Sequence, residues 1–154
     1  MQTYFLPRRY APSKATLIGS VSAGTPLDPN PFQTRKRFDI PVPLRRFNMF
    51  VLQVDGDSMT IPYGDGMPHG TYVLIDRKDI LTDRGYVFAF CLDDGTYVVK
   101  RLQLFKGRPA MWSDNTAYAP VHITSSVRNC GRVYATSSDG VTWQPTRYRG
   151  FSLS

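Results

Sequence analysis

Short apolar runs separated by turn signals dominate the chain from Met49 onward. They are rich in β-branched and aromatic residues, and none keeps a helical period for more than a turn or two, which favours strands. The runs cover residues 49–54, 71–75, 86–92, 96–104, 109–112, 130–136 and, more weakly, 141–143. The pattern predicts an all-β, mainly β fold.

Turn signals and acidic composition support the same fold class. Asp93-Asp94-Gly95 lies between two apolar runs and predicts a hairpin, because Asp and Gly tolerate positive φ. Lys106-Gly107 and Ser138-Asp139-Gly140 divide later runs in the same way. All 12 acidic residues are Asp and none is Glu, and Asp prefers turns to helix interiors.

Residues 1–46 differ from the rest of the chain. They contain seven of the 12 prolines, and one piece, residues 16–22, has strand character. Such a segment forms only short extended pieces. We therefore expect an extended N-terminal arm over residues 1–46, one compact β domain over residues 47–143, and a C-terminal tail over residues 144–154.

The net charge of +7 is unevenly distributed. Residues 1–46 carry a net charge of +6, residues 47–100 carry −4, and residues 101–154 carry +5. A protein that bound DNA along its whole face would not need an acidic middle third. Direct DNA binding is therefore left open, beside a plain role of the charge in solubility and steering.

The cysteine and histidine content argues against a disulfide framework and a metal site. Cys91 lies in an apolar strand and is expected to be a small core residue, and Cys130 is the only other cysteine. With His69 and His122 as the only histidines and no Cys-x-x-Cys, we expect no metal and no cofactor. No apolar run approaches membrane-spanning length and the N-terminus lacks a signal-peptide core, so we expect a cytoplasmic protein without a membrane partner.

A serine and a lysine are the candidate chemical groups. Ser58 follows Gly56 and Asp57 at the end of an apolar strand, where backbone N–H groups can hold an oxyanion. Lys100 lies within Tyr-Val-Val-Lys-Arg-Leu, and strand alternation puts it on the face of Val98 and Leu102. Burial there lowers the pKa of the amine, and a neutral amine can serve as general base for a serine. From patterning alone, Ser58 in a plain turn and Lys100 reaching solvent stay open.

Five motifs follow one another along the chain: Val-Asp-Gly-Asp-Ser-Met (54–59), Gly-Thr-Tyr-Val-Leu-Ile-Asp (70–76), Tyr-Val-Val-Lys-Arg-Leu (97–102), Asn-Thr-Ala-Tyr-Ala-Pro (115–120) and Gly-Arg-Val (131–133). This ordered set resembles the LexA/UmuD-type self-cleaving proteins, the peptidase S24 family. The resemblance spans about residues 17–135. It implies a compact β domain like those of LexA and signal peptidase.

The resemblance also implies a catalytic site. Val21-Ser22-Ala23-Gly24 looks like the family's self-cleavage segment, with the scissile bond between Ala23 and Gly24 and with Val21 as the anchor. Ser58 would be the nucleophile and Lys100 the general base. The backbone N–H groups of Asp57 and Ser58 would form the oxyanion hole. The loop between Ser58 and Gly70 is longer than in the shortest family members, which bears on subfamily rather than chemistry.

Within the family, the layout is similar to UmuD-type proteins, because only 23 residues precede Gly24 and these lack the pattern of a helix-turn-helix domain. That layout implies a homodimer that cleaves itself when stimulated by a RecA–single-stranded-DNA filament and then serves a Y-family, UmuC-type DNA polymerase in SOS mutagenesis. Two alternatives stay open: a LexA or prophage-type repressor body lacking its DNA-binding domain, and a non-enzymatic basic β module that binds nucleic acid. A type I signal peptidase also uses a serine and a lysine, but it would need a membrane anchor, so we do not expect that class.

Overall fold

A computed structural model describes residues 11–21, 36–61, 66–80 and 84–146, and these contain no α-helix. The all-β prediction is confirmed. The strands are β1 (Lys14–Val21), β2 (Arg37–Asp39), β3 (Met49–Val54), β4 (Tyr72–Asp76), β5 (Val87–Cys91), β6 (Tyr97–Phe105), β7 (Arg108–Trp112), β8 (Val121–His122), β9 (Arg128–Ser137) and β10 (Gln144–Pro145), with one 3-10 turn, η2 (Val42–Leu44).

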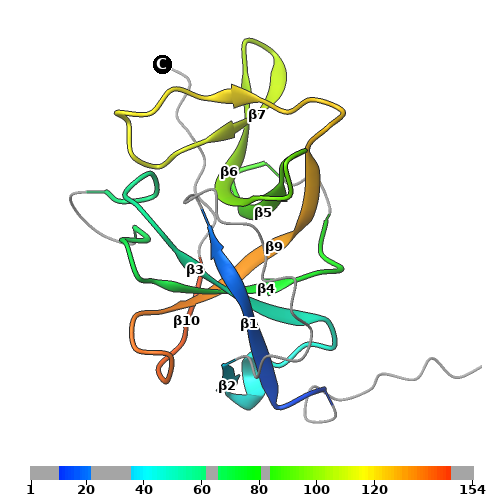
Figure 1. Ribbon diagram of the computed structural model, residues 1–154, viewed down its shortest axis with the longest axis vertical. Helices are drawn as coiled ribbons and strands as arrows, with labels where there is room; N and C mark the ends of the chain where they lie inside the picture. The colour runs from blue at the N-terminus through cyan, green and yellow to red at the C-terminus, as the bar shows by residue number, and fades with distance from the viewer. Residues whose placement is uncertain (1–10, 22–35, 62–65, 81–83, 147–154) are drawn as a thin grey trace, which may run out of the picture.

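The strands form one sheet in the order β2-β1-β3-β4-β9-β5-β6-β7-β8, and β10 pairs with β9. The long strand β9 (orange in Figure 1) connects the strands from β2 to β4 with the strands from β5 to β8 in this order. It pairs with β4 and β10 through one stretch and with β5 through another. The strands β6 and β7 lie at one end of the molecule, and β2 lies at the other (Figure 1). Every pairing is antiparallel except that of β1 with β3.

The central residues of β3, β4 and β5 are buried on both faces, which explains why these runs are mainly apolar. In β3, Phe50, Leu52 and Val54 pack into one core cluster, whereas Val51 packs into a second. In β5, the alternate side chains of Phe88 and Phe90 pack into a third. Cys91 is 5% exposed at the end of β5, as expected for a core residue.

Most predicted strands match the observed ones to within one or two residues, but the weak strand at 141–143 is wrong. The carboxylate of Asp139 accepts hydrogen bonds from the backbone N–H groups of Val141 and Thr142, both at 2.8 Å. These groups are therefore used in a side-chain-stabilised turn rather than in a strand ladder. The short strand β10 begins one residue after the predicted run.

The segment predicted as an arm contributes strands to the sheet. The strand β1 pairs in parallel with β3 over Leu17–Val21 and also packs against β6, while β2 pairs with the start of β1. Ala15 of β1 is 1% exposed. The division at residues 46 and 143 stays a prediction, and β1, β2 and β10 pair with strands inside the range 47–143.

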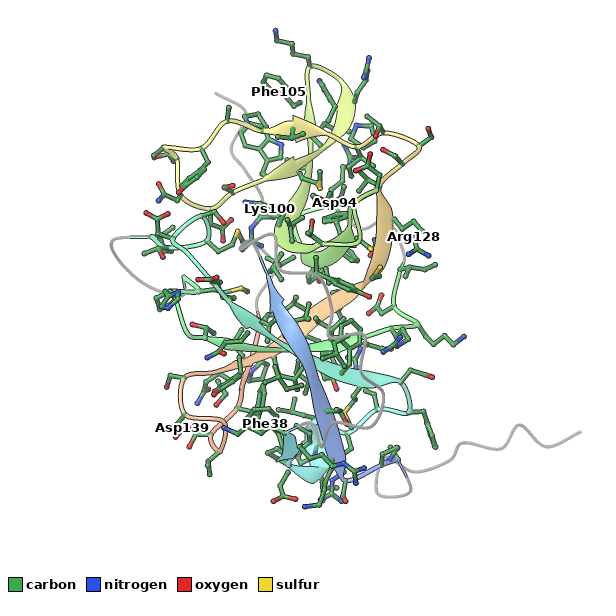
Figure 2. All side chains as sticks on the ribbon, viewed as in Figure 1. Phe38, Asp94, Lys100, Phe105, Arg128 and Asp139 are labelled. Atoms are coloured by element: carbon green, nitrogen blue, oxygen red, sulfur yellow. The ribbon has the colours of Figure 1, made fainter. Side chains whose placement is uncertain are left out.

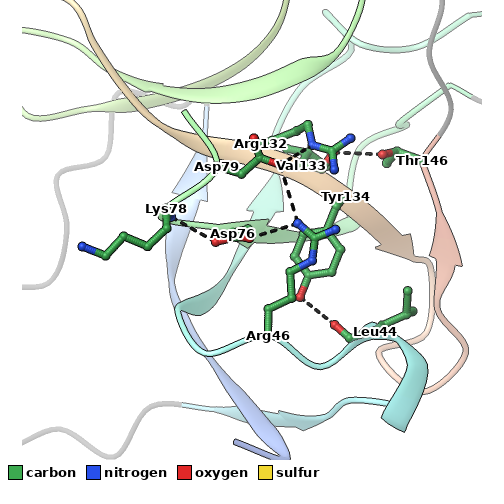
Figure 3. A network of polar contacts seen from close by, with 9 residues as sticks. All are labelled: Leu44, Arg46, Asp76, Lys78, Asp79, Arg132, Val133, Tyr134 and Thr146. Carbon is green, nitrogen blue, oxygen red and sulfur yellow. Dashed lines mark hydrogen bonds and ion pairs between the residues drawn. The ribbon is translucent and has the colours of Figure 1, made fainter. Parts of the chain in front are cut away.

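A polar network fastens the chain before β3 to the centre of the sheet (Figure 3). Arg46 donates to Asp76 at 2.9 Å and lies 4.0 Å from the ring centre of Tyr134. Arg132 of β9 donates to Asp79 at 2.7 Å, and the same carboxylate lies 3.6 Å from Arg46. Tyr134 in turn donates to the backbone carbonyl of Leu44 at 2.8 Å. Two carboxylates thus share two guanidinium groups, a networked arrangement that holds residues 44–46 against β4 and β9.

No helix in the described part of the chain is long and apolar enough to cross a membrane.

Candidate active site

Ser58 lies in a turn directly after β3. Gly56 adopts φ +90°, a conformation that favours glycine, and the backbone N–H of Thr60 closes the turn by donating to the carbonyl of Asp57 at 3.0 Å. Met59 is 1% exposed and packs into the same core cluster as Val54. The buried methionine therefore anchors the turn, and Ser58 itself is only 7% exposed.

Lys100 lies in the middle of β6, on the face that the alternation predicts. Val98 and Leu102 pack with the third core cluster, and Lys100 alternates with them along the regular strand. Its amine is labelled near the centre of the molecule in Figure 2. Burial lowers the pKa of the Lys100 amine, and the negative charge of Asp114 partly opposes that shift. Compared with an exposed lysine, a larger fraction of this amine is neutral at a given pH.

A three-residue segment after β7 contacts both candidate residues. The amine of Lys100 donates to the hydroxyl of Ser113 with an Nζ–Oγ distance of 2.7 Å. The backbone N–H of Asn115 donates to the backbone carbonyl of Ser58 at 2.9 Å. Residues 113–115 thus hold Ser58 on one side and Lys100 on the other.

Tyr118 makes a second connection between the two sides. Its hydroxyl donates to the carboxylate of Asp57, the residue before Ser58, and the same ring centre lies 5.7 Å from Nζ of Lys100. Asn115 adds a side-chain hydrogen bond from Nδ2 to the carbonyl of Asp57 at 3.1 Å. The hydrogen bond from the Tyr118 hydroxyl to the Asp57 carboxylate raises the pKa of that hydroxyl.

A buried ion pair holds residues 113–115 in place. Arg101, next to Lys100 on β6, donates to both carboxylate oxygens of Asp114 at 2.8 Å, and its third hydrogen bond goes to the carbonyl of Gly85 at 2.6 Å. The two side chains are 6% and 2% exposed. The backbone N–H of Asp114 also meets Sδ of Met59 at 3.4 Å. Because the two N–H groups of arginine form a rigid fork, the pair fixes the orientation of the Asp114 carboxylate relative to β6.

The predicted cleavage segment is described only in part. Ala23 and Gly24 lie outside the described residues, and for Val21 only the backbone, at the end of β1, is described. That backbone lies opposite Val54 in the β1–β3 register. The oxyanion role expected of the Asp57 and Ser58 N–H groups stays a prediction.

The histidines are not part of this site. His69 accepts a hydrogen bond from the N–H of Gly56 at 3.0 Å and lies 3.2 Å from Asp55, so it supports the turn before Ser58. His122 lies on β8, 3.4 Å from the carbonyl of Pro109. Within the described ranges, no group of three or more His, Cys, Asp or Glu side chains is placed to hold a metal ion.

Comparison with known proteins identifies the family. The model of the family described as Peptidase S24-like matches residues 16–134, a range that includes Ser58, Lys100 and the segment 113–115. The chain belongs to the peptidase S24-like family. It is also 30% identical, over 132 residues, to the LexA repressors of Leuconostoc mesenteroides and Leuconostoc citreum. Each alignment covers 84% of this chain and 60% of the relative, so the chain spans about 60% of the length of these curated relatives.

Membership of the S24-like family confirms the resemblance that the ordered motifs indicate, at the level of the family. Sequence reasoning did not single out Ser113 and Asp114. A signal for Ser113 was present, because a two-residue hairpin turn at Lys106-Gly107 pairs Lys100 with position 113. Arg101 and Asp114 carry no comparable signal, since their pairing depends on how the chain leaves β7.

Proposed function

We propose that this S24-like protein cleaves its own chain between Ala23 and Gly24, with Ser58 as nucleophile and Lys100 as general base. The observation that carries the proposal is the segment 113–115, which contacts Lys100 through one residue and Ser58 through another. Ser58 is a buried serine, Lys100 is a lysine of lowered pKa, and both contact this short segment. Together they supply the two groups that Ser–Lys catalysis requires.

The proposed reaction is an acyl transfer followed by hydrolysis. The neutral amine of Lys100 takes the proton of the Ser58 hydroxyl while Oγ bonds to the carbonyl carbon of Ala23. The backbone N–H groups of Asp57 and Ser58 stabilise the oxyanion. The bond from Ala23 to the nitrogen of Gly24 then breaks, and that nitrogen receives the proton from Lys100. Water, deprotonated by the same amine, hydrolyses the ester and restores Ser58.

The course of β1 supports this choice of peptide bond. The strand β1 runs parallel to β3, so the two strands end in the same direction. The strand β3 continues to Ser58, and β1 continues to Ala23. Since Val21 lies opposite Val54, only two residues separate the paired end of β1 from the bond at Ala23, a reach of roughly 7 Å. Val21 is proposed to anchor the segment, and the small residues Ala23 and Gly24 suit an extended chain in a narrow site.

The physiological role proposed is of the UmuD type. In it, a RecA–single-stranded-DNA filament stimulates cleavage, and the cleaved homodimer serves a Y-family, UmuC-type polymerase. A second candidate, the body of a repressor, is favoured by one observation, since both relatives named above are LexA repressors. For that candidate, cleavage would end repression rather than assist a polymerase.

Incubation at mildly alkaline pH, with and without RecA filaments, tests the cleavage proposal. We expect a fragment whose first residue is Gly24, identified by N-terminal sequencing. Ser58→Ala and Lys100→Met should each abolish it, because they remove the nucleophile and the base. Lys106→Ala is the matched control, since Lys106 is an exposed lysine on the β6–β7 turn and its removal should leave cleavage intact. An intact wild-type chain under all these conditions would contradict self-cleavage.

Binding experiments then separate the roles. Retention of a Y-family polymerase by the cleaved protein, and not by the Ser58→Ala protein, would support the UmuD-type role. Loss of specific operator binding on cleavage of the full-length gene product would support the repressor role. Steeply salt-dependent binding of the uncleaved chain to any duplex DNA, without cleavage, would favour a nucleic-acid-binding module instead.

A further inference from the structure

We propose that Ser113 is a positioning residue, whose hydroxyl holds the Lys100 amine in the orientation that receives the proton of Ser58. This inference rests on the proposed self-cleavage, and it adds a third side chain to the Ser58–Lys100 pair.

The sheet itself places Ser113 beside Lys100. In the antiparallel β6–β7 pair, Arg101 lies opposite Trp112, so the next position of that register sets Lys100 against Ser113. Residues opposite each other in such a pair project to the same face. The 2.7 Å hydrogen bond from Nζ to Oγ is therefore a consequence of the hairpin register and not of a flexible loop.

The Ser113 hydroxyl is also held relative to Ser58. The next residue, Asp114, is held by two hydrogen bonds from buried Arg101, and the one after it, Asn115, donates to the carbonyl of Ser58. Ser113 is 7% exposed, as are Ser58 and Asp114. Ser113 is thus a buried hydroxyl with a defined location relative to both candidate catalytic residues.

A lysine base needs such a partner because its side chain has four rotatable bonds. A neutral amine has two N–H groups and one lone pair, and donation of one N–H to Ser113 restricts the direction of the lone pair. After proton transfer, the ammonium keeps this hydrogen bond. An arrangement that is ready before the reaction avoids reorganisation during it.

Among the described residues, few charged or titratable groups lie near Lys100, so the effect of Ser113 on the pKa of the amine can be told apart from theirs. Asp114, on the segment after β7, raises the pKa of the amine, and the ring of Tyr118, which is hydrogen-bonded to Asp57, lies 5.7 Å away. On the other side, β5 brings only the apolar Phe88 opposite Lys100. Acceptance by the Ser113 hydroxyl favours the charged amine, so its loss lowers the pKa of Lys100 further.

Self-cleavage rates of Ser113→Ala and Ser113→Thr, measured across a pH series, test the proposal. For Ser113→Ala we expect the maximal rate at high pH to fall roughly 10- to 100-fold, because the base is no longer oriented. The midpoint of the pH profile should move to lower pH. Ser113→Thr keeps the hydroxyl and should restore most of the rate and the wild-type midpoint.

The direction of the midpoint separates positioning from a general loosening of the site. Loosening admits water to Lys100 and would move the midpoint up, toward an ordinary lysine, which would overturn the proposal. Ser137→Ala is the matched control, because Ser137 is a buried serine, 3% exposed, whose hydroxyl bonds to Asp139 at the far end of the molecule (Figure 2). It should change neither the maximal rate nor the midpoint.

A second measurement does not depend on cleavage. In the uncleavable Ser58→Ala protein, the Lys100 titration can be followed by NMR with and without Ser113→Ala. An equal midpoint in the two proteins, or a wild-type maximal rate for Ser113→Ala, would overturn the role of Ser113. Failure of the wild-type chain to cleave would instead overturn the proposed function, and the NMR comparison would still report on Ser113.

Discussion

The backbone of Val21 lies opposite that of Val54 in the one parallel pairing found among the described strands. The end of β1 is therefore attached to the same chain's own β3, four residues before Ser58. This relationship predicts that the chain cleaves itself rather than a second copy.

The prediction of cleavage within one chain is tested by kinetics and by mixing. The rate should be first order and independent of protein concentration. In a mixture of the Ser58→Ala protein with a protein that carries Ala23→Asp but an intact Ser58, the Ser58→Ala chain should stay whole. Cleavage of that chain in the mixture would show that the site acts between copies.

The half-buried Lys100 predicts the pH dependence of cleavage. Burial disfavours the charged amine, so the folded-state pKa lies below the ordinary value of about 10.4. The rate should rise roughly tenfold per pH unit while most of the amine is charged, and should level off at a midpoint below that value. The series of first-order rates against pH gives the midpoint directly. A rate that is flat with pH, or a midpoint at or above the ordinary value, would show that Lys100 is not the base.

The buried Arg101–Asp114 pair predicts a large loss of stability on substitution. Asp114→Ala leaves a guanidinium without its carboxylate at a position 6% exposed, and we expect the free energy of unfolding to fall by about 3–5 kcal/mol. Urea unfolding measures this change. Arg101→Leu combined with Asp114→Leu should cost less than Asp114→Ala alone, because it removes both charges.

A surface pair provides the control for that experiment. Lys14 and Asp39 form an ion pair at 2.9 Å, with side chains 53% and 83% exposed. Asp39→Ala should change the free energy of unfolding by less than about 1 kcal/mol. Equal effects of Asp39→Ala and Asp114→Ala would contradict the importance assigned to burial.

Two glycines with positive φ predict different costs for the same change. Gly131 in β9 has φ +127°, and an added Cβ would collide with the backbone carbonyl of Asp76 in β4. Gly95 in the β5–β6 turn has φ +84° and open space around a Cβ. We expect Gly131→Ala to lower the free energy of unfolding by at least about 2 kcal/mol and Gly95→Ala by about 1 kcal/mol. Thermal unfolding of the two variants side by side checks the order.

Several parts of the fold could be predicted from sequence, and others could not, for identifiable reasons. The run at 49–54 matches β3 residue for residue, because five of its six residues are apolar and its centre is buried on both faces. The run at 141–143 failed because the Asp139 side chain competes for the backbone N–H groups there. The parallel attachment of β1 to β3 carries no local signal, since its partners are more than 30 residues apart along the chain.

The candidate site divides in the same way. Local patterning and the ordered motifs were enough to single out Ser58 and Lys100, because a serine after a glycine turn and a lysine between apolar residues are visible in a few consecutive positions. They were not enough to find the Arg101–Asp114 pair, whose geometry depends on the path of the chain beyond β7.

By itself, then, the amino-acid sequence determined most of the longer strands, which face of β6 carries Lys100, and the order of the family's motifs. The tertiary structure alone decided that β1 lies beside β3 and that residues 113–115 contact both Ser58 and Lys100. The physical reason is that alternation selects the face of a strand, whereas the choice of neighbouring strand depends on the burial of the whole sheet at once.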